Sequence, residues 1–191
     1  MAGYTDLPAD LPVPEDDGAA THLAGMTLPS VSLSATDGSS VDLSKLAGTL
    51  VLYAYPMTGV PGAPLPEGWD EIPGARGCTP QSCAFRDHVD ELRKAGADHV
   101  FGLSTQTTGY QREAADRLHL PFPLLSDNAL RLKEALDLPV FEASVPGQNT
   151  VLLKRLAFVA RGRMIVKVFY PVFPPDQNAT DVLDWLLINP T

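Results

Sequence analysis

The sequence predicts an α/β protein in which a central mixed β-sheet is flanked by helices. Continuous apolar runs bounded by Pro, Gly or Asp are typical of buried strands, and they alternate along the chain with segments of helical period. Toward the C-terminus, strands joined by a turn precede a closing helix, an order that places helices on both faces of a sheet. A chain of 191 residues suits one domain with a substantial core.

The chain begins with an acidic segment and a β-hairpin. Residues 1–24 carry five acidic residues and no Lys or Arg, and they show no period. They predict an extended arm, which leaves residues 25–191 as the folded domain. In "VSLSATDGSSVDL" (31–43), apolar and polar residues alternate on both sides of an Asp-Gly pair. This pattern predicts an N-terminal β-hairpin.

A buried strand and a long loop precede the first helix. "TLVLYAYP" (49–56) is a continuous apolar run that ends at a proline, which predicts a central strand. Residues 57–77 are rich in Pro and Gly and have no period, which predicts an inserted loop. "TPQSCAFRDHVDELRKAGA" (79–97) then predicts one helix, with Thr79 as its cap and Pro80 in its first turn.

The remaining segments continue the alternation of strands and helices. The expected elements are a strand in "HVFGLST" (99–105), a helix in "GYQREAADRLHL" (109–120), a short strand in "FPLLSD" (122–127), a helix in "NALRLKEALDL" (128–138), two strands joined at Gly162 in "TVLLKRLAFVARGRMIVKVFYP" (150–171) and a helix in "NATDVLDWLLI" (178–188).

Charge and hydropathy exclude several classes of partner. The net charge is −9, and no basic stripe exists that could neutralise phosphates, which argues against nucleic-acid binding. No apolar run reaches the ~20 residues of a membrane span. The N-terminus lacks the basic start and apolar core of a secretory signal. We therefore expect a cytoplasmic protein that binds neither nucleic acid nor membrane.

The reactive residues are concentrated in "GARGCTPQSCAFRDH" (74–88), which holds both cysteines of the chain. Cys78 lies where a loop enters a helix, and the free N–H groups there favour a thiolate. Two close cysteines in a reducing compartment are more often catalytic, redox-sensing or metal-binding than structural. Five residues along a helix separate two Cα atoms by about 8.7 Å, whereas a disulfide needs about 4.4–6.8 Å. Pairing of Cys78 with Cys83 would therefore require the helix to unwind, which Gly77 and Pro80 make easier.

The cysteine spacing also leaves other functions open. Cys78, Cys83 and His88 have a spacing allowed for zinc ligands, but on one helix they point in three directions, so we expect no metal. A general thiol–disulfide reductase is an alternative, although the Cys-x-x-Cys motif typical of that class is absent. A redox sensor or binding protein is another, in which the same unwinding would switch a partner surface.

Several ordered segments together resemble a peroxiredoxin of the Q type, also called bacterioferritin-comigratory protein. The resemblance covers about residues 25–188, and its most specific segment is "GCTPQSCAFRD". The supporting segments are "LPSVSLSATDGSSVDLSKLAGTLVLYAYP", "VFGLST", "LPFPLLSD" and "KRLAFVARGRMI". The resemblance implies a thioredoxin-like fold and a thiol peroxidase that needs no cofactor or metal.

The resemblance also implies roles for individual residues. Cys78 would be the peroxidatic cysteine, which becomes a sulfenic acid, and Cys83 the resolving cysteine that condenses with it. Arg155 fits the family's active-site arginine, and Gln81 fits the residue that orients this arginine. The implied substrates are hydrogen peroxide and organic hydroperoxides, and the implied reductant is thioredoxin or a similar dithiol. A monomer or weak dimer is expected.

One position departs from the family pattern. Where the family has Thr three residues before the peroxidatic cysteine, this chain has Ala75. Our hypothesis is that the insertion at 60–75 loops out, so that Thr58 still delivers its hydroxyl to the site. Thr79 and Arg76 are the alternatives. The insertion either forms a lip over the site that narrows substrate choice or is a decorated surface loop.

Overall fold

The computed structural model describes Leu7, residues 10–145, Gln148 and residues 150–191. The strands are β1 Ser32–Ala35, β2 Ser40–Asp42, β3 Thr49–Ala54, β4 His99–Ser104, β5 Leu124–Ser126, β6 Val140–Glu142, β7 Val151–Leu153, β8 Leu156–Arg161 and β9 Met164–Phe169. The helices are α1 Cys78–Asp87, α2 Val89–Lys94, α3 Thr108–Arg117, α4 Arg131–Leu136 and α5 Asn178–Ile188. Short 3₁₀ turns are η1 Thr21–Leu23, η2 Leu43–Lys45, η3 Trp69–Glu71 and η4 Pro175–Gln177.

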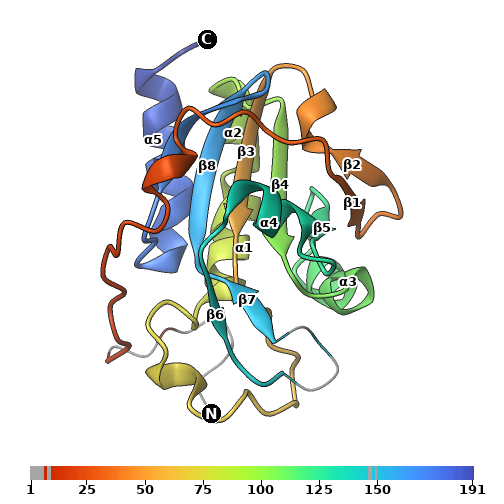
Figure 1. Cartoon of the computed structure of the whole chain (residues 1–191), viewed down its shortest axis with the longest axis vertical. Helices are drawn as coiled ribbons and strands as arrows, with labels where there is room; N and C mark the ends of the chain where they lie inside the picture. The colour runs from red at the N-terminus through yellow and green to blue at the C-terminus, as the bar shows by residue number, and fades with distance from the viewer. Residues whose placement is uncertain (1–6, 8–9, 146–147, 149) are drawn as a thin grey trace.

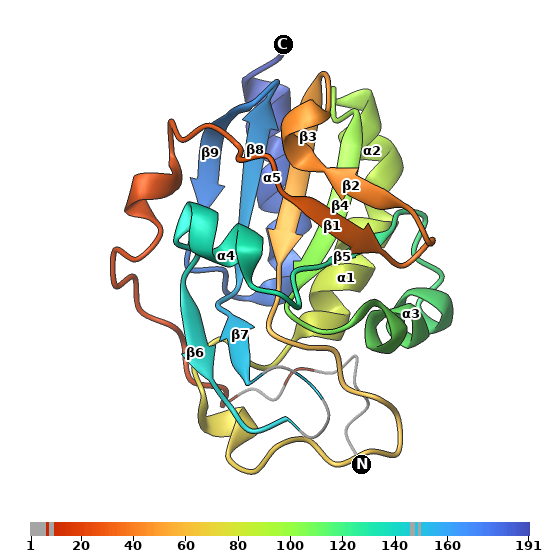
Figure 2. The same ribbon diagram turned by 45° about the vertical axis from the view of Figure 1, so that its right-hand side comes forward.

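The main sheet is mixed, as the sequence predicts, and the fold is thioredoxin-like. Its strand order is β2-β1-β5-β4-β3-β8-β9. The three central strands β5, β4 and β3 run parallel, while β1 and β2 on one side and β8 and β9 on the other pair antiparallel (Figure 2). The predicted N-terminal hairpin is confirmed as β1 and β2, and the predicted turn at Gly162 joins β8 to β9.

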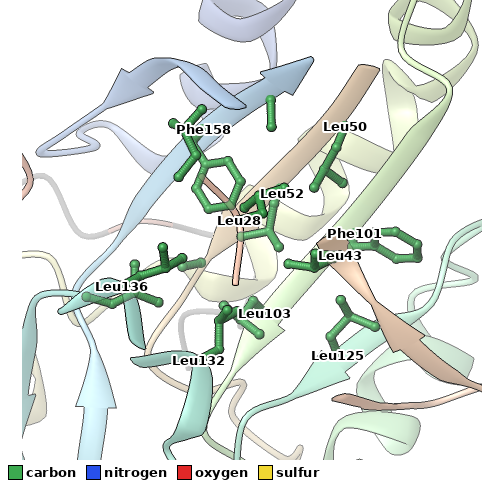
Figure 3. Packing of buried hydrophobic residues seen from close by; sticks show 14 of the residues in the cluster. Leu28, Leu43, Leu50, Leu52, Phe101, Leu103, Leu125, Leu132, Leu136 and Phe158 are labelled. Atoms are coloured by element: carbon green, nitrogen blue, oxygen red, sulfur yellow. The ribbon is translucent and has the colours of Figure 1, made fainter. Parts of the chain in front are cut away.

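Strand β3 divides the core into two apolar layers. It is buried along its whole length, and its side chains alternate between the faces of the sheet. Leu50 and Leu52 face a cluster completed by α4 and the N-terminal hairpin (Figure 3). Val51 and Tyr53 face the opposite cluster, to which α1, α2 and α5 contribute (Figure 1). Burial on both faces explains why β3 reads as a continuous apolar run.

The predicted single helix over 79–97 is wrong in two respects. The helix begins at Cys78, its N-cap is Gly77, and no side chain caps it, so Thr79 is not the cap. It also breaks at His88, which leaves α1 and α2 as separate helices. The two acidic residues that follow the break lie in the first turn of α2, where the helix dipole favours negative charge.

The predicted pair of strands over 150–171 is also wrong, because the structure has three strands there. The chain leaves β7 and enters β8 at Lys154 and Arg155, and β7 pairs with the unpredicted strand β6 in a separate two-stranded sheet. The Lys154 N–H donates to Pro139 O at 2.8 Å, which holds this break in place. The break therefore places Arg155 at the end of the main sheet, beside the small hairpin.

The inserted segment 57–77 packs against this small hairpin at one end of the sheet (Figures 1 and 2). It is a loop, as predicted, with one 3₁₀ turn, η3. A third apolar cluster joins the two regions, formed by Met57, Trp69, Ala75, Val145 and Leu152. The insertion therefore has a small core of its own against the rest of the domain.

The N-terminal segment is tied to the domain at several points. Ala20 and Leu23 are buried in the larger core cluster, so this part of the predicted arm packs firmly. The Asp17 carboxylate accepts from Lys154 Nζ at 2.6 Å and from the Tyr170 hydroxyl at 2.7 Å. Within the described part of the chain, none of the helices has the length and apolar character needed to cross a membrane.

Candidate active site

Cys78 is the first residue of α1 and is almost completely buried, at 4 % exposure. The residue before it, Gly77, has a φ of +105°, a left-handed conformation that L side chains rarely adopt. A Cβ atom at Gly77 would lie 2.3 Å from Cγ of Pro175, so η4 closes over the backbone at this point. Gly77 thus lets the loop turn into the helix while η4 covers the turn.

The guanidinium of Arg155 contacts the sulfur of Cys78. Arg155 is 3 % exposed, and its Nη2 lies 3.2 Å from Cys78 Sγ. The same Nη2 donates to the carbonyls of Gly74, Ala75 and Arg76 at 3.1–3.2 Å, which fixes the cation under the chain that leads into α1. The sequence places these two residues 77 positions apart, and the end of β8 brings them together.

The buried charge of Arg155 has no carboxylate partner among the residues that the structure describes. Burial of an unpaired charge is costly, so a nearby anion is strongly favoured. The sulfur of Cys78 is the group in contact that can carry negative charge. Arg155 therefore places a buried cation directly beside Cys78 Sγ, at the N-terminus of α1.

Two amides extend the contact from Arg155 into α5. Arg155 Nη1 donates to Gln81 Oε1, and Gln81 Nε2 donates to Asn178 Oδ1 at 2.9 Å. Gln81 and Asn178 are both fully buried. Gln81 therefore lies where the resemblance expects it, against the arginine. The sequence does not predict a place for Asn178 in the site, because a residue that begins the last helix has no spacing pattern that links it to Cys78.

The structure places Thr58 in a buried position whose hydroxyl is unpaired. Its N–H donates to Gln106 Oε1 at 3.0 Å, but its Oγ1 has no hydrogen-bond partner among the described residues. Thr58 is not part of the wall of the cavity at Cys78, whereas Thr79 and Arg76 are. The two alternatives to Thr58 therefore line the cavity. Thr58 does not line it, but its neighbours Met57 and Gly59 both do.

Cys78 faces a small cavity. Its volume is about 20 Å³, and it is lined by Met57, Gly59, Leu65, Trp69, Ala75, Arg76, Gly77, Cys78 and Thr79. A space of this size holds about one water-sized molecule. A larger cavity of about 340 Å³ lies against Arg155 and Gly74, but Cys78 does not line it. Of these two cavities, the smaller one is the one that Cys78 lines.

Cys83 has a different environment on the same helix. It is half-buried, and both thiols are free. Burial raises the pKa of the Cys83 thiol above its ordinary value, and the nearby cations Arg86 and Arg117 oppose this shift without overcoming it. Because α1 is continuous from Cys78 to Asp87, the two cysteines are held too far apart for a disulfide.

Comparisons with known proteins bear on the family and the fold of this chain. Residues 23–183 match the family model described as Redoxin. The chain is 32% identical to "Peroxiredoxin Q, chloroplastic" of Populus jackii over 165 residues, which is 85% of this chain and 67% of that protein. It is 32% identical to "Peroxiredoxin Bcp" of Escherichia coli over 85% of this chain and 94% of that one. The crystal structure of peroxidoxin BcpB from Mycobacterium tuberculosis superposes with a TM-score of 0.68 at 26% identity, covering 88% of this chain and 98% of that one.

Proposed function

Because this chain belongs to the Redoxin family and is a peroxiredoxin of the Q/Bcp type, we propose that Cys78 is its peroxidatic cysteine and Cys83 its resolving cysteine. The enzyme is a thiol-dependent peroxidase. The observation that carries the assignment is the 3.2 Å contact between Arg155 Nη2 and Cys78 Sγ. The two cysteines differ in this respect, since the Arg155 guanidinium beside Cys78 is almost completely buried, whereas Arg86, which hydrogen-bonds to Cys83, is only partly buried.

In the first step, the Cys78 thiolate attacks the terminal oxygen of a hydroperoxide. The O–O bond breaks, the sulfur is oxidised to a sulfenic acid, and the leaving alkoxide or hydroxide takes a proton to become an alcohol or water. Arg155 places positive charge beside the sulfur and donates toward the oxygen on which negative charge develops. Gln81 and Asn178 orient Arg155 through the amide contacts described above.

In the second step, the Cys83 thiol condenses with the sulfenic acid. A disulfide forms between Cys78 and Cys83, and water leaves. The first turns of α1 must unwind for the two sulfurs to meet. A dithiol such as thioredoxin then reduces this disulfide, and both thiols are restored.

The hydroxyl that the family places three residues before the peroxidatic cysteine comes from another position in this chain. We assign it to Thr58, because its buried Oγ1 is unpaired and its neighbours Met57 and Gly59 both line the cavity at Cys78. Thr79, which lines the cavity directly, is the competing position. Comparison of Thr58→Val with Thr79→Val separates the two: the variant of the residue that supplies the hydroxyl reduces peroxide more slowly.

Turnover in the presence of a dithiol tests the proposed function. With thioredoxin and its reductase, the parent protein is expected to consume many equivalents of hydrogen peroxide, and Cys78→Ser none. Cys83→Ser is expected to be oxidised once and then recycled poorly by thioredoxin. A single stoichiometric oxidation of the parent without turnover would favour a redox sensor. Reduction of insulin disulfides without peroxide consumption would favour a general disulfide reductase.

A further inference from the structure

We propose that the inserted segment 57–77 makes this enzyme selective for hydrogen peroxide over bulky organic hydroperoxides, and that Trp69 is the main residue that sets this selectivity. The inference rests on the proposed role of Cys78 as the sulfur that reacts with peroxide. The resemblance implies both hydrogen peroxide and organic hydroperoxides as substrates, and this inference restricts them to the smaller ones.

The cavity at Cys78 is small because the insertion supplies one of its walls. Of its lining residues, Leu65 and Trp69 come from the middle of the insertion, whereas Ala75, Arg76 and Gly77 lead into α1. The volume of about 20 Å³ admits a molecule close to water in size. A hydroperoxide that carries an aromatic ring cannot reach Cys78 Sγ without displacing this wall.

Trp69 is held rigidly in its position. It is 3 % exposed, and its ring lies against that of Phe141 on β6 with 6.0 Å between centroids. Met57 and Leu152 belong to the same apolar cluster. A buried tryptophan packed on several sides loses a large apolar contact area if it swings out, so the wall resists a bulky substrate.

The insertion is also fastened to the segment that precedes Cys78. Asp70, next to Trp69, pairs with Arg76 at 2.9 Å between Oδ1 and Nη1. The Ala75 N–H donates to Ile72 O at 3.1 Å, which closes a turn between η3 and α1. The indole therefore moves with the backbone around the peroxidatic sulfur, and it does not behave as an independent surface loop.

The inference is tested by the ratio of kcat/KM for cumene hydroperoxide to that for hydrogen peroxide. In the parent protein this ratio is expected to be well below one. Trp69→Ala removes the indole from the wall, and we expect the ratio to rise at least about tenfold, since pocket size discriminates by about 10–200-fold for small changes in volume. Leu65 lines the same cavity and is only partly buried. Leu65→Ala is therefore expected to fold normally and to raise the ratio less than Trp69→Ala does.

The matched control is Trp185→Ala. Trp185 lies on α5 beneath the guanidinium of Arg161 and does not line the cavity. Its variant is expected to keep the parent ratio. An equal ratio in the parent, Trp69→Ala and Leu65→Ala would overturn the selectivity inference alone. Absence of peroxide turnover in the parent would overturn the proposed function and this inference with it. If Trp69→Ala does not fold, Leu65→Ala decides the matter.

Discussion

The two cysteines of this protein lie on one helix, five residues apart, in opposite chemical environments. Cys78 is buried at the helix start with the Arg155 guanidinium 3.2 Å from its sulfur. Cys83 is half-buried on the next turn, and burial raises the pKa of its thiol. The difference shows that sequence spacing alone does not assign chemical roles. The buried guanidinium of Arg155, which directly precedes β8, distinguishes Cys78 from Cys83.

The comparison also explains the order of the proposed steps. The thiol beside the buried cation is expected to react first with peroxide, and the thiol whose pKa is raised by burial is expected to react later. The intact helix keeps them apart, so the second step waits for α1 to unwind.

Removal of the cation at Cys78 is expected to have the largest effect. Arg155→Met should slow oxidation of Cys78 by hydrogen peroxide about 10²–10³-fold, the usual loss when one preorganised donor to the reacting centre is removed. The rate is measured by stopped-flow fluorescence. Lys154→Met, a change of the neighbouring half-exposed cation, is the control and should keep the parent rate. A parent-like rate in Arg155→Met would remove the distinction between the two cysteines.

Gly77→Ala should disturb the environment of Cys78 through the backbone. The variant combines a strained positive φ with a contact of 2.3 Å to Pro175 Cγ, so η4 must shift away from α1. We expect a loss of about 1–3 kcal/mol in the free energy of unfolding, measured with urea. Gly38→Ala has the same sign of φ but nothing within 4 Å of its new Cβ, so it isolates the backbone strain. Equal losses in the two variants would show that η4 does not constrain the turn.

Asn178→Ala should weaken the support of Arg155 without touching the reacting atoms. Its Oδ1 accepts from Gln81 Nε2, and loss of this buried hydrogen bond costs about 1 kcal/mol. We expect the peroxide reaction to slow about fivefold, with KM for thioredoxin unchanged. Asn178→Asp retains an acceptor and should restore most of the rate. A variant that loses stability but keeps its rate would show that Asn178 does not act through Arg155.

The smallest expected effect concerns the pH dependence of Cys83. Because the raised pKa keeps this thiol protonated to higher pH, its alkylation in Cys78→Ser should increase with pH through a midpoint above that of a free cysteine. Iodoacetamide labelling followed by mass measures the midpoint, with N-acetylcysteine as the reference. A midpoint at or below the reference would contradict the contrast between the two environments.

The sheet and the position of Cys78 could be predicted from the sequence, because buried strands and a loop-to-helix junction leave local patterns. The helix break at His88 could not, since the apolar spacing continues across it and the segment still reads as one helix. The break between β7 and β8 could not be predicted either, because apolar residues lie on both sides of Lys154 and Arg155.

Parts of the site depend on tertiary packing and left no local signal. Gln81 and Arg155 were expected together through the family resemblance, and the structure brings them into contact. Asn178 is 97 residues from Gln81, and no spacing connects them. Trp69 lies in an aperiodic loop, and its place in the wall of the cavity at Cys78 depends on the contact of its ring with Phe141 on the unpredicted strand β6.

Intact mass after one equivalent of hydrogen peroxide tests the central claim most directly. The parent should lose about 2 Da as a disulfide forms, Cys83→Ser should gain about 16 Da or its higher oxides, and Cys78→Ser should show no fast change. This result would assign attack to Cys78 and resolution to Cys83. Equal and slow oxidation of the two single variants would contradict the account, because neither environment would then activate its thiol.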